Sequence, residues 1–151
     1  MVRRTLAIFP LGAALLAISC GGGGGTPEET VETFNGHMAA KDFEGATALV
    51  YCRDWPGAPG AELEAKRAAY ADVLAKRYDG DDLDYGRAEI TERTPRSRDE
   101  VEFAVAYRRR AGPSGPPAVL KLTVKEVEGR WYYVPGLIGD RAPAPGMDEQ
   151  R

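Results

Sequence analysis

The chain offers few side chains for nucleophilic or acid–base catalysis. It has one histidine, His37, two cysteines, Cys20 and Cys52, and only three serines. Two of the serines, Ser97 and Ser114, stand in turn-forming segments, away from the helical stretch that carries His37. A hydrolytic triad needs a nucleophile, an imidazole and a carboxylate in hydrogen-bond contact, and a zinc site needs several Cys or His ligands. The sequence therefore predicts neither, and we expect His37 to have a structural role.

Aromatic side chains are the stronger candidates for contact with a ligand. In the segments that alternate like β-strands, the inward positions are apolar or aromatic and include no carboxylate or imidazole. A cavity between them could hold an apolar ligand, but it would lack a general base. The candidate lining residues are Tyr70, Phe103, Tyr107, Trp131 and Tyr133. The alternative, which we favour, is that these rings fill the core.

Two charged runs lack the spacing of a binding site. An EF-hand loop needs oxygen ligands at its positions 1, 3, 5 and 12, but in the run that starts at Asp79 the fifth position is Leu83. We therefore predict a helix-ending turn there, with no metal and no other cofactor. The arginines at 93–98 and at 108–110 are expected at opposite ends of a strand meander, and the net charge is −3. These features predict no nucleic-acid interface.

The amino-terminal segment contains the features of a lipid-attachment signal. Two arginines precede an apolar run from Leu6 to Ile18, which is too short to span a bilayer. The run leads into Ala17-Ile18-Ser19-Cys20, which resembles the lipobox of bacterial lipoproteins. The resemblance implies cleavage before Cys20 and attachment of fatty-acyl chains, such as palmitate, that hold the protein at the extracytoplasmic face of a bacterial membrane. The alternative is an ordinary signal peptide with a chance cysteine.

The composition divides the 151 residues into four parts, one of which is a folded domain. Residues 1–19 form the signal peptide. Residues 20–25 comprise Cys20 and five glycines, which predict a flexible tether. Residues 26–138 contain the periodic segments of a folded domain, and residues 139–151 form a flexible tail rich in alanine, proline and glycine.

Periodicity within the domain predicts three helices followed by four strands. Thr26-Pro27-Glu28-Glu29 has the pattern of a capping box, and apolar residues follow at positions 31, 34 and 38. A second helix is predicted from Asp42 and a third over Ala61 to Tyr78. Period-two alternation then predicts strands at 86–91, 101–108, 120–125 and 131–134. This order is typical of an α+β fold in which three N-terminal helices pack on a curved four-stranded antiparallel sheet.

Three short motifs add a family resemblance. The segments Thr26–Val31, Ala39–Ala46 and Gly129–Tyr133, together with the order of elements, resemble small bacterial lipoproteins of unknown function with a nuclear-transport-factor-2-like (NTF2-like, SnoaL-like) domain. The resemblance implies a cystatin-like cone of sheet around a helix. This superfamily includes isomerases, dehydratases, cyclases and non-catalytic modules, so the resemblance does not define an activity.

We therefore expect a lipid-anchored envelope protein that binds a protein or a small hydrophobic ligand without catalysis. One alternative is a small-molecule enzyme that uses the cone cavity. Another is a structural or inhibitory protein that acts through an exposed Trp55 in its turn-rich loop. A monomer is expected because charged residues would be costly to bury in a dimer through the outward sheet face. These residues are Arg87, Glu89, Glu102, Arg108, Lys121 and Lys125.

Overall fold

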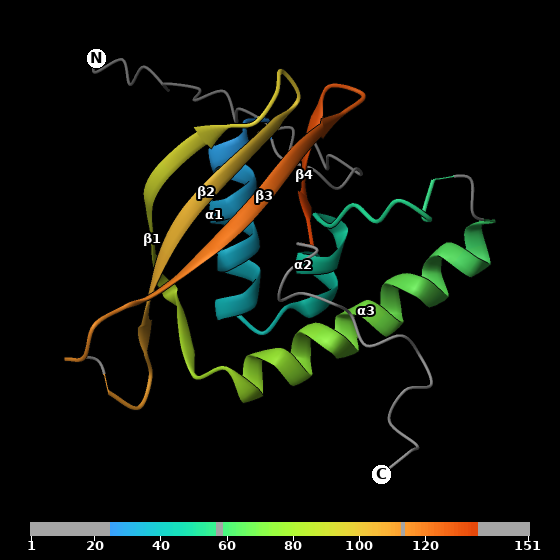
Figure 1. Cartoon of the computed structure of the whole chain (residues 1–151). Helices are drawn as coiled ribbons and strands as arrows, with labels where there is room; N and C mark the ends of the chain where they lie inside the picture. The colour runs from blue at the N-terminus through green and yellow to red at the C-terminus, as the bar shows by residue number, and fades with distance from the viewer. Residues whose placement is uncertain (1–24, 57–58, 113, 136–151) are drawn as a thin grey trace, which may run out of the picture.

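The computed structural model describes residues 25–56, 59–112 and 114–135. In this part of the chain, three helices precede four strands (Figure 1). The helices are α1 (Pro27–Ala39), α2 (Phe43–Ala48) and α3 (Gly60–Gly80). The strands are β1 (Leu83–Pro95), β2 (Glu100–Arg109), β3 (Ala118–Val127) and β4 (Arg130–Val134). They form an antiparallel sheet in the order β1-β2-β3-β4, which confirms the predicted fold class.

The first helix begins as the sequence predicts. The Thr26 hydroxyl accepts a hydrogen bond from the Glu29 backbone N–H at 3.1 Å, and the Glu29 carboxylate accepts one from the Thr26 backbone N–H at 3.0 Å. This capping box satisfies two backbone donors that the first turn of a helix otherwise leaves without partners. The start of the domain is thereby fixed directly after the predicted tether.

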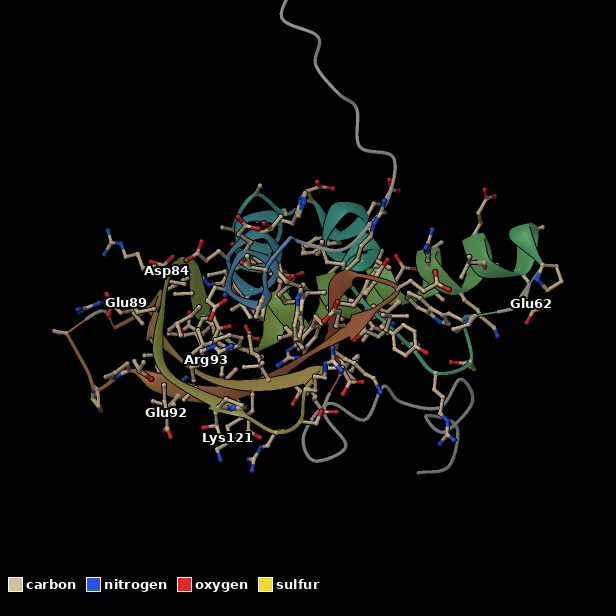
Figure 2. All side chains as sticks on the ribbon, turned by 90° about the horizontal axis from the view of Figure 1, so that it is seen from above. Glu62, Asp84, Glu89, Glu92, Arg93 and Lys121 are labelled. Carbon is tan, nitrogen blue, oxygen red and sulfur yellow. The ribbon has the colours of Figure 1, made fainter. Side chains whose placement is uncertain are left out.

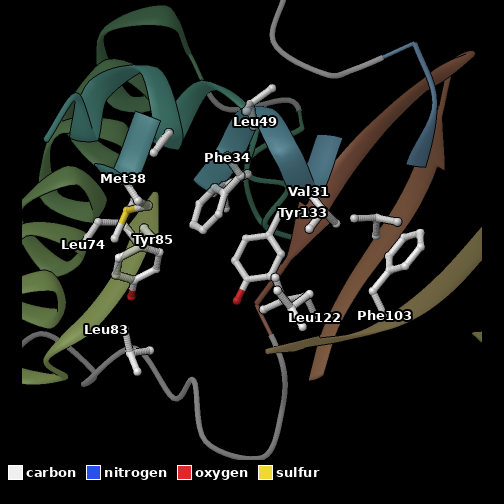
Figure 3. Packing of buried hydrophobic residues seen from close by; sticks show 14 of the residues in the cluster. Val31, Phe34, Met38, Leu49, Leu74, Leu83, Tyr85, Phe103, Leu122 and Tyr133 are labelled. Carbon is white, nitrogen blue, oxygen red and sulfur yellow. The ribbon is translucent and has the colours of Figure 1, made fainter. Parts of the chain in front are cut away.

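The core lies between α1 and the concave face of the sheet. Figure 1 shows the helices on one side of the curved sheet, with the amino-terminal part of α3 extending past it. The Phe34 ring packs against the Tyr133 ring with centroids 4.7 Å apart (Figure 3). The alternating residues of β2 are buried as predicted: Val101, Phe103, Val105 and Tyr107. Within the described residues, the buried hydrophobic residues run from Val31 to Tyr133.

The first strand is longer than predicted and is bent. It begins at Leu83 instead of Gly86, and both Leu83 and Tyr85 are buried. Its pairing with β2 shifts register between Asp84 and Glu89, where extra residues enter β1, and again between Ile90 and Glu92. Bulges of this kind bend a strand and change the direction of its side chains. They contribute to the curvature of the sheet at this edge.

The predicted exposure of Trp55 is wrong. Only 8% of Trp55 is exposed, and its ring packs edge-to-face on Tyr70 of α3 with centroids 5.9 Å apart. The surrounding prolines and glycines suggest a surface loop, but the loop folds back and buries its aromatic residue. The hypothesis of an exposed tryptophan contact is therefore abandoned.

Candidate functional site

Within the described residues, the five predicted aromatic residues do not line one large cavity together. Tyr107 and Tyr133 line an enclosed core cavity of about 10 Å³, together with Tyr85 and Arg77. That volume is about the space one water molecule needs. It is far smaller than the several hundred cubic ångströms of a typical ligand site.

The other three candidates lie elsewhere. Phe103 is fully buried in the core but does not line this cavity. Tyr70 contacts Trp55, as described above. Trp131 is partly buried, and its backbone carbonyl accepts a hydrogen bond from Thr30 at 3.3 Å. In these places the rings build the domain, which agrees with the alternative of core packing.

A larger space opens between α1 and β1. This α1–β1 groove has a volume of about 540 Å³, which falls within the range of small-molecule sites. Its polar side chains are Glu32 and Asn35 from α1, and Tyr85 and Glu89 from β1. Its apolar lining is formed by Val31, Ala88, Ile90 and Val105. The bulged segment of β1 thus supplies one wall of the groove.

Contacts between the same two elements hold the groove at both ends. Near the start of α1, Arg93 Nε lies 2.8 Å from Glu28 Oε1. Near its end, Gly86 passes beside Ala39, so closely that a methyl group on Gly86 would lie 3.7 Å from the Ala39 methyl. The groove residues of α1 fall between these two contacts in sequence, and so do Ala88, Glu89 and Ile90 of β1. The opening is therefore framed by the packing of α1 on β1.

The charges within the groove are acidic. Glu32 and Glu89 are both exposed, one on the helix side and one on the strand side. Within the described residues, neither carboxylate makes an ion pair or a hydrogen bond. Figure 2 places Glu89 at the edge of the sheet, whereas Glu92 and Lys121 lie on the face away from the helices. The predicted position of Glu89 on that outward face is therefore wrong, because the bulge in β1 turns it toward the groove.

A buried amide lies at the bottom of the groove. Asn35 is 5% exposed, and its Oδ1 accepts a hydrogen bond from the Tyr107 hydroxyl at 3.0 Å. The Nδ2 group of Asn35 has no hydrogen-bond partner within the described residues, and it is not completely shielded from solvent. Asn35 and Tyr107 thus join the groove to the core cavity, and the amide keeps a donor for whatever occupies the groove.

Tyr85 lines both spaces. Its hydroxyl donates a hydrogen bond to Asp81 Oδ2 at 2.6 Å, and Arg77 Nε lies 3.6 Å from the same oxygen. Burial, followed by the neighbouring Asp81, raises the pKa of the Tyr85 hydroxyl above its ordinary value. Tyr85 therefore stays neutral and acts as a hydrogen-bond donor and not as a base.

The residues capable of nucleophilic chemistry are not assembled. His37 Nδ1 lies 2.7 Å from Asp42 Oδ2, where the pair joins the end of α1 to the start of α2. Cys52 is the free thiol of the described residues, and burial, with the nearby Asp54, raises its pKa to about 11. A thiol with that pKa is almost entirely protonated at neutral pH, so it is a poor nucleophile.

The aspartates after α3 have structural partners. Asp81 accepts the Tyr85 hydroxyl, Asp82 Oδ1 lies 3.7 Å from Arg110 Nε, and Asp84 Oδ2 lies 3.6 Å from Arg87 Nε. No group of three metal-ligating side chains occurs among the residues that the structure describes. None of the helices in the described ranges is both long and apolar enough to cross a membrane.

The basic residues also remain separate. Arg96 Nη2 lies 2.7 Å from Glu102 Oε1, and Lys121 Nζ lies 3.1 Å from the same oxygen. The loops between β1 and β2 and between β2 and β3 fall at opposite ends of the meander, as predicted. The arginines are consequently divided between two places, each with nearby acids.

The sequence reasoning missed the principal groove residues. Asn35 is four residues after Val31 and three before Met38, so helical periodicity could have placed it at the buried stripe. Tyr85 is followed by alternating residues, but the acidic turn before it suggested a loop. No local pattern identifies Glu89, because its direction depends on the register shift. Cys20, the signal peptide and the tail lie outside the described residues.

Comparison with known proteins supports the fold and no more. No protein-family model matches the chain, and no curated protein matches its sequence. Among solved structures, it is similar to a Campylobacter jejuni protein provisionally described as an NTF2-like transpeptidase. The TM-score is 0.54 at 12% sequence identity, and the match covers 72% of this chain and 97% of the other. The described residues therefore have an NTF2-like fold, as the resemblance implied.

Proposed function

We propose that this protein is an extracytoplasmic lipoprotein whose NTF2-like domain binds a ligand in the α1–β1 groove without converting it. The observation that carries the proposal is the groove itself. It offers about 540 Å³ with a buried Asn35 amide facing it, whereas the core cavity beside it holds only about 10 Å³. The proposed ligand space thus lies between α1 and β1 and not in the core.

The chemistry of the surrounding residues supports binding over catalysis. Tyr85 is held neutral, Cys52 is held as a thiol, and His37 is paired with Asp42 away from the groove lining. The two groove carboxylates, Glu32 and Glu89, are exposed to solvent. An acyl transfer of the kind named for the Campylobacter protein needs an activated nucleophile next to a base. The described residues offer no such pair near the groove.

The anchor is proposed from the sequence before the domain. Cys20 ends a lipobox-like segment, and the glycines that follow it lead directly to the capped start of α1. More than one acyl chain gives stable membrane attachment, whereas a single chain binds reversibly. The tether would let the groove face the periplasm or the exterior while the acyl chains stay in the bilayer.

Fractionation of cells that express the chain tests the anchor. We expect the wild-type protein in the membrane fraction, and we expect Cys20→Ala, or globomycin treatment, to release the protein or to stall its precursor. Cys52→Ala is the matched control, since it also removes one thiol but should leave the distribution unchanged. A Cys20→Ala protein that fractionates like the wild type and is processed normally would refute lipidation.

A further inference from the structure

We infer that the ligand of the α1–β1 groove is an amphipathic cation: a molecule with an ammonium group, an uncharged hydrogen-bond acceptor close to it, and an apolar chain. The inference rests on the proposed function, since it specifies the ligand of the same groove. Three features of the groove each select one part of such a molecule.

The carboxylates select the positive charge. Glu32 and Glu89 enter the groove from α1 and β1, and neither has a cationic partner within the described residues. The two basic residues of β1 are paired with other acids: Arg87 Nε lies 3.6 Å from Asp84 Oδ2, and Arg93 Nε lies 2.8 Å from Glu28 Oε1. An anionic ligand would meet two like charges, whereas a cation would gain an attraction to both.

The buried amide selects the acceptor. Asn35 is 95% buried, and its Oδ1 is occupied by the Tyr107 hydroxyl at 3.0 Å. The remaining Nδ2 donor has no partner within the described residues, so a ligand carbonyl or ether oxygen would satisfy it.

The apolar wall selects the chain. Val31 and Val105 lie at the base of the groove and are almost completely buried, and Ala88 and Ile90 extend this surface along β1. The volume of about 540 Å³ can take an alkyl chain in addition to the polar head. Burial of that chain would supply most of the affinity, and the charges would supply the selectivity.

A second opening on the molecule lacks this combination. The groove between α2 and α3, of about 250 Å³, also contains two acids, Glu44 and Glu64. It includes Arg67, however, and the rest of its lining is Thr47 and two alanines. The excess negative charge is smaller there, and no buried amide faces it. Its acids therefore provide matched controls.

The probe for the test is glycine octyl ester at pH 6, where its amine is protonated. N-acetylglycine octyl ester is the neutral analogue, and mono-octyl succinate is the anionic analogue. Decylammonium keeps the charge and nearly the same chain length but has no ester oxygen. Calorimetric titrations use residues 21–151, which include every buried hydrophobic residue that the structure describes. We expect the cationic ester to bind about tenfold more tightly than the neutral one and the anion to bind weakest, because two exposed charge contacts typically give a few-fold each. Decylammonium should bind several-fold more weakly than the cationic ester.

The variants assign the preference to residues. Glu32→Gln combined with Glu89→Gln should remove the preference for the cation while retaining the neutral ester. Glu44→Gln combined with Glu64→Gln should change neither affinity. Equal binding of the cationic, neutral and anionic esters would overturn the ligand class but leave the groove as an apolar ligand site. Absence of binding by all four probes, or a groove occupied by a second copy in a concentration-dependent dimer, would overturn the proposed groove function together with this inference.

Discussion

Removal of one hydroxyl from Tyr107 should destabilise the domain far more than its size suggests. In the wild type, the Tyr107 hydroxyl donates to Asn35 Oδ1 at 3.0 Å, and the two residues are 1% and 5% exposed. Tyr107→Phe removes this donor from Asn35 Oδ1, in a place that water reaches poorly. An unsatisfied buried acceptor costs about 1–3 kcal/mol. For a domain of this size, that loss corresponds to a decrease in Tm of roughly 4–12 °C.

A thermodynamic cycle separates this hydrogen bond from general effects of mutation. Asn35→Leu alone should also destabilise, because it leaves the Tyr107 hydroxyl without this acceptor. The double variant should lose less than the sum of the two, because both ends of the bond are then apolar, with a coupling of about 1–2 kcal/mol. Tyr132→Phe is the control, since the Tyr132 hydroxyl has no hydrogen bond within the described residues. Melting curves followed by circular dichroism provide the measurement. A Tyr107→Phe domain that melts like the wild type, or strict additivity in the double variant, would show that the hydrogen bond between Tyr107 and Asn35 does not stabilise the domain.

Further predictions concern the helices and the titratable groups. A methyl group on Gly45 would overlap the Asp42 carboxylate and the His37 ring, so Gly45→Ala should lower the free energy of unfolding by about 1 kcal/mol through loss of the α2 cap. At Gly36 the added methyl would have no atom within 4 Å, so Gly36→Ala should raise the free energy of unfolding by up to about 1 kcal/mol. A denaturant titration measures both changes. The Gly45 N–H and His37 lower the pKa of Asp42, so the contribution of Asp42 to stability is present above its ordinary pKa of 3.8 and is lost as the pH falls through the lower pKa of the folded state. Asp42→Asn should therefore weaken the decrease in Tm that melting curves at pH 2–6 show on acidification. An unchanged decrease would contradict the assignment to Asp42. With its pKa raised to about 11, the Cys52 thiol should react with iodoacetamide at pH 8 roughly 100-fold more slowly than after unfolding, and fast alkylation of the folded chain would show that the thiol is accessible and acidic. The stability of the domain should also decline as the pH rises from about 9 to 11. Cys52→Ala should lessen that decline.

Local sequence signals predicted the elements whose stability is local. The capping box at Thr26 and Glu29 is satisfied within one helical turn, and the alternation in β2 needs only one buried face. Both patterns therefore survive in the structure as they read in the sequence. The three-helix, four-strand order followed from these signals and is confirmed by the fold.

The groove depends on contacts that a local pattern does not contain. Glu89 faces it because extra residues enter β1 between Asp84 and Glu89, and this register shift exists only when β1 pairs with β2. Trp55 is buried because α3 supplies Tyr70 as a partner, although its own neighbours are typical of an exposed turn. Phe103, Tyr107 and Tyr133 are buried, whereas Tyr70 and Trp131 are only partly buried. The volume left between aromatic side chains depends on how they pack in three dimensions, which sequence periodicity does not report.

Amide NMR of the isotope-labelled chain, titrated with glycine octyl ester, is the sharpest test of ligand binding in the α1–β1 groove, because it locates the ligand without reference to affinity. Binding in the α1–β1 groove predicts chemical-shift changes concentrated at residues 31–36 of α1 and 85–90 of β1, with small changes along α2 and the first half of α3. Shift changes centred on the groove between α2 and α3 would contradict binding in the α1–β1 groove. So would the absence of shift changes at a ligand concentration that saturates other proteins binding ligands of comparable hydrophobicity.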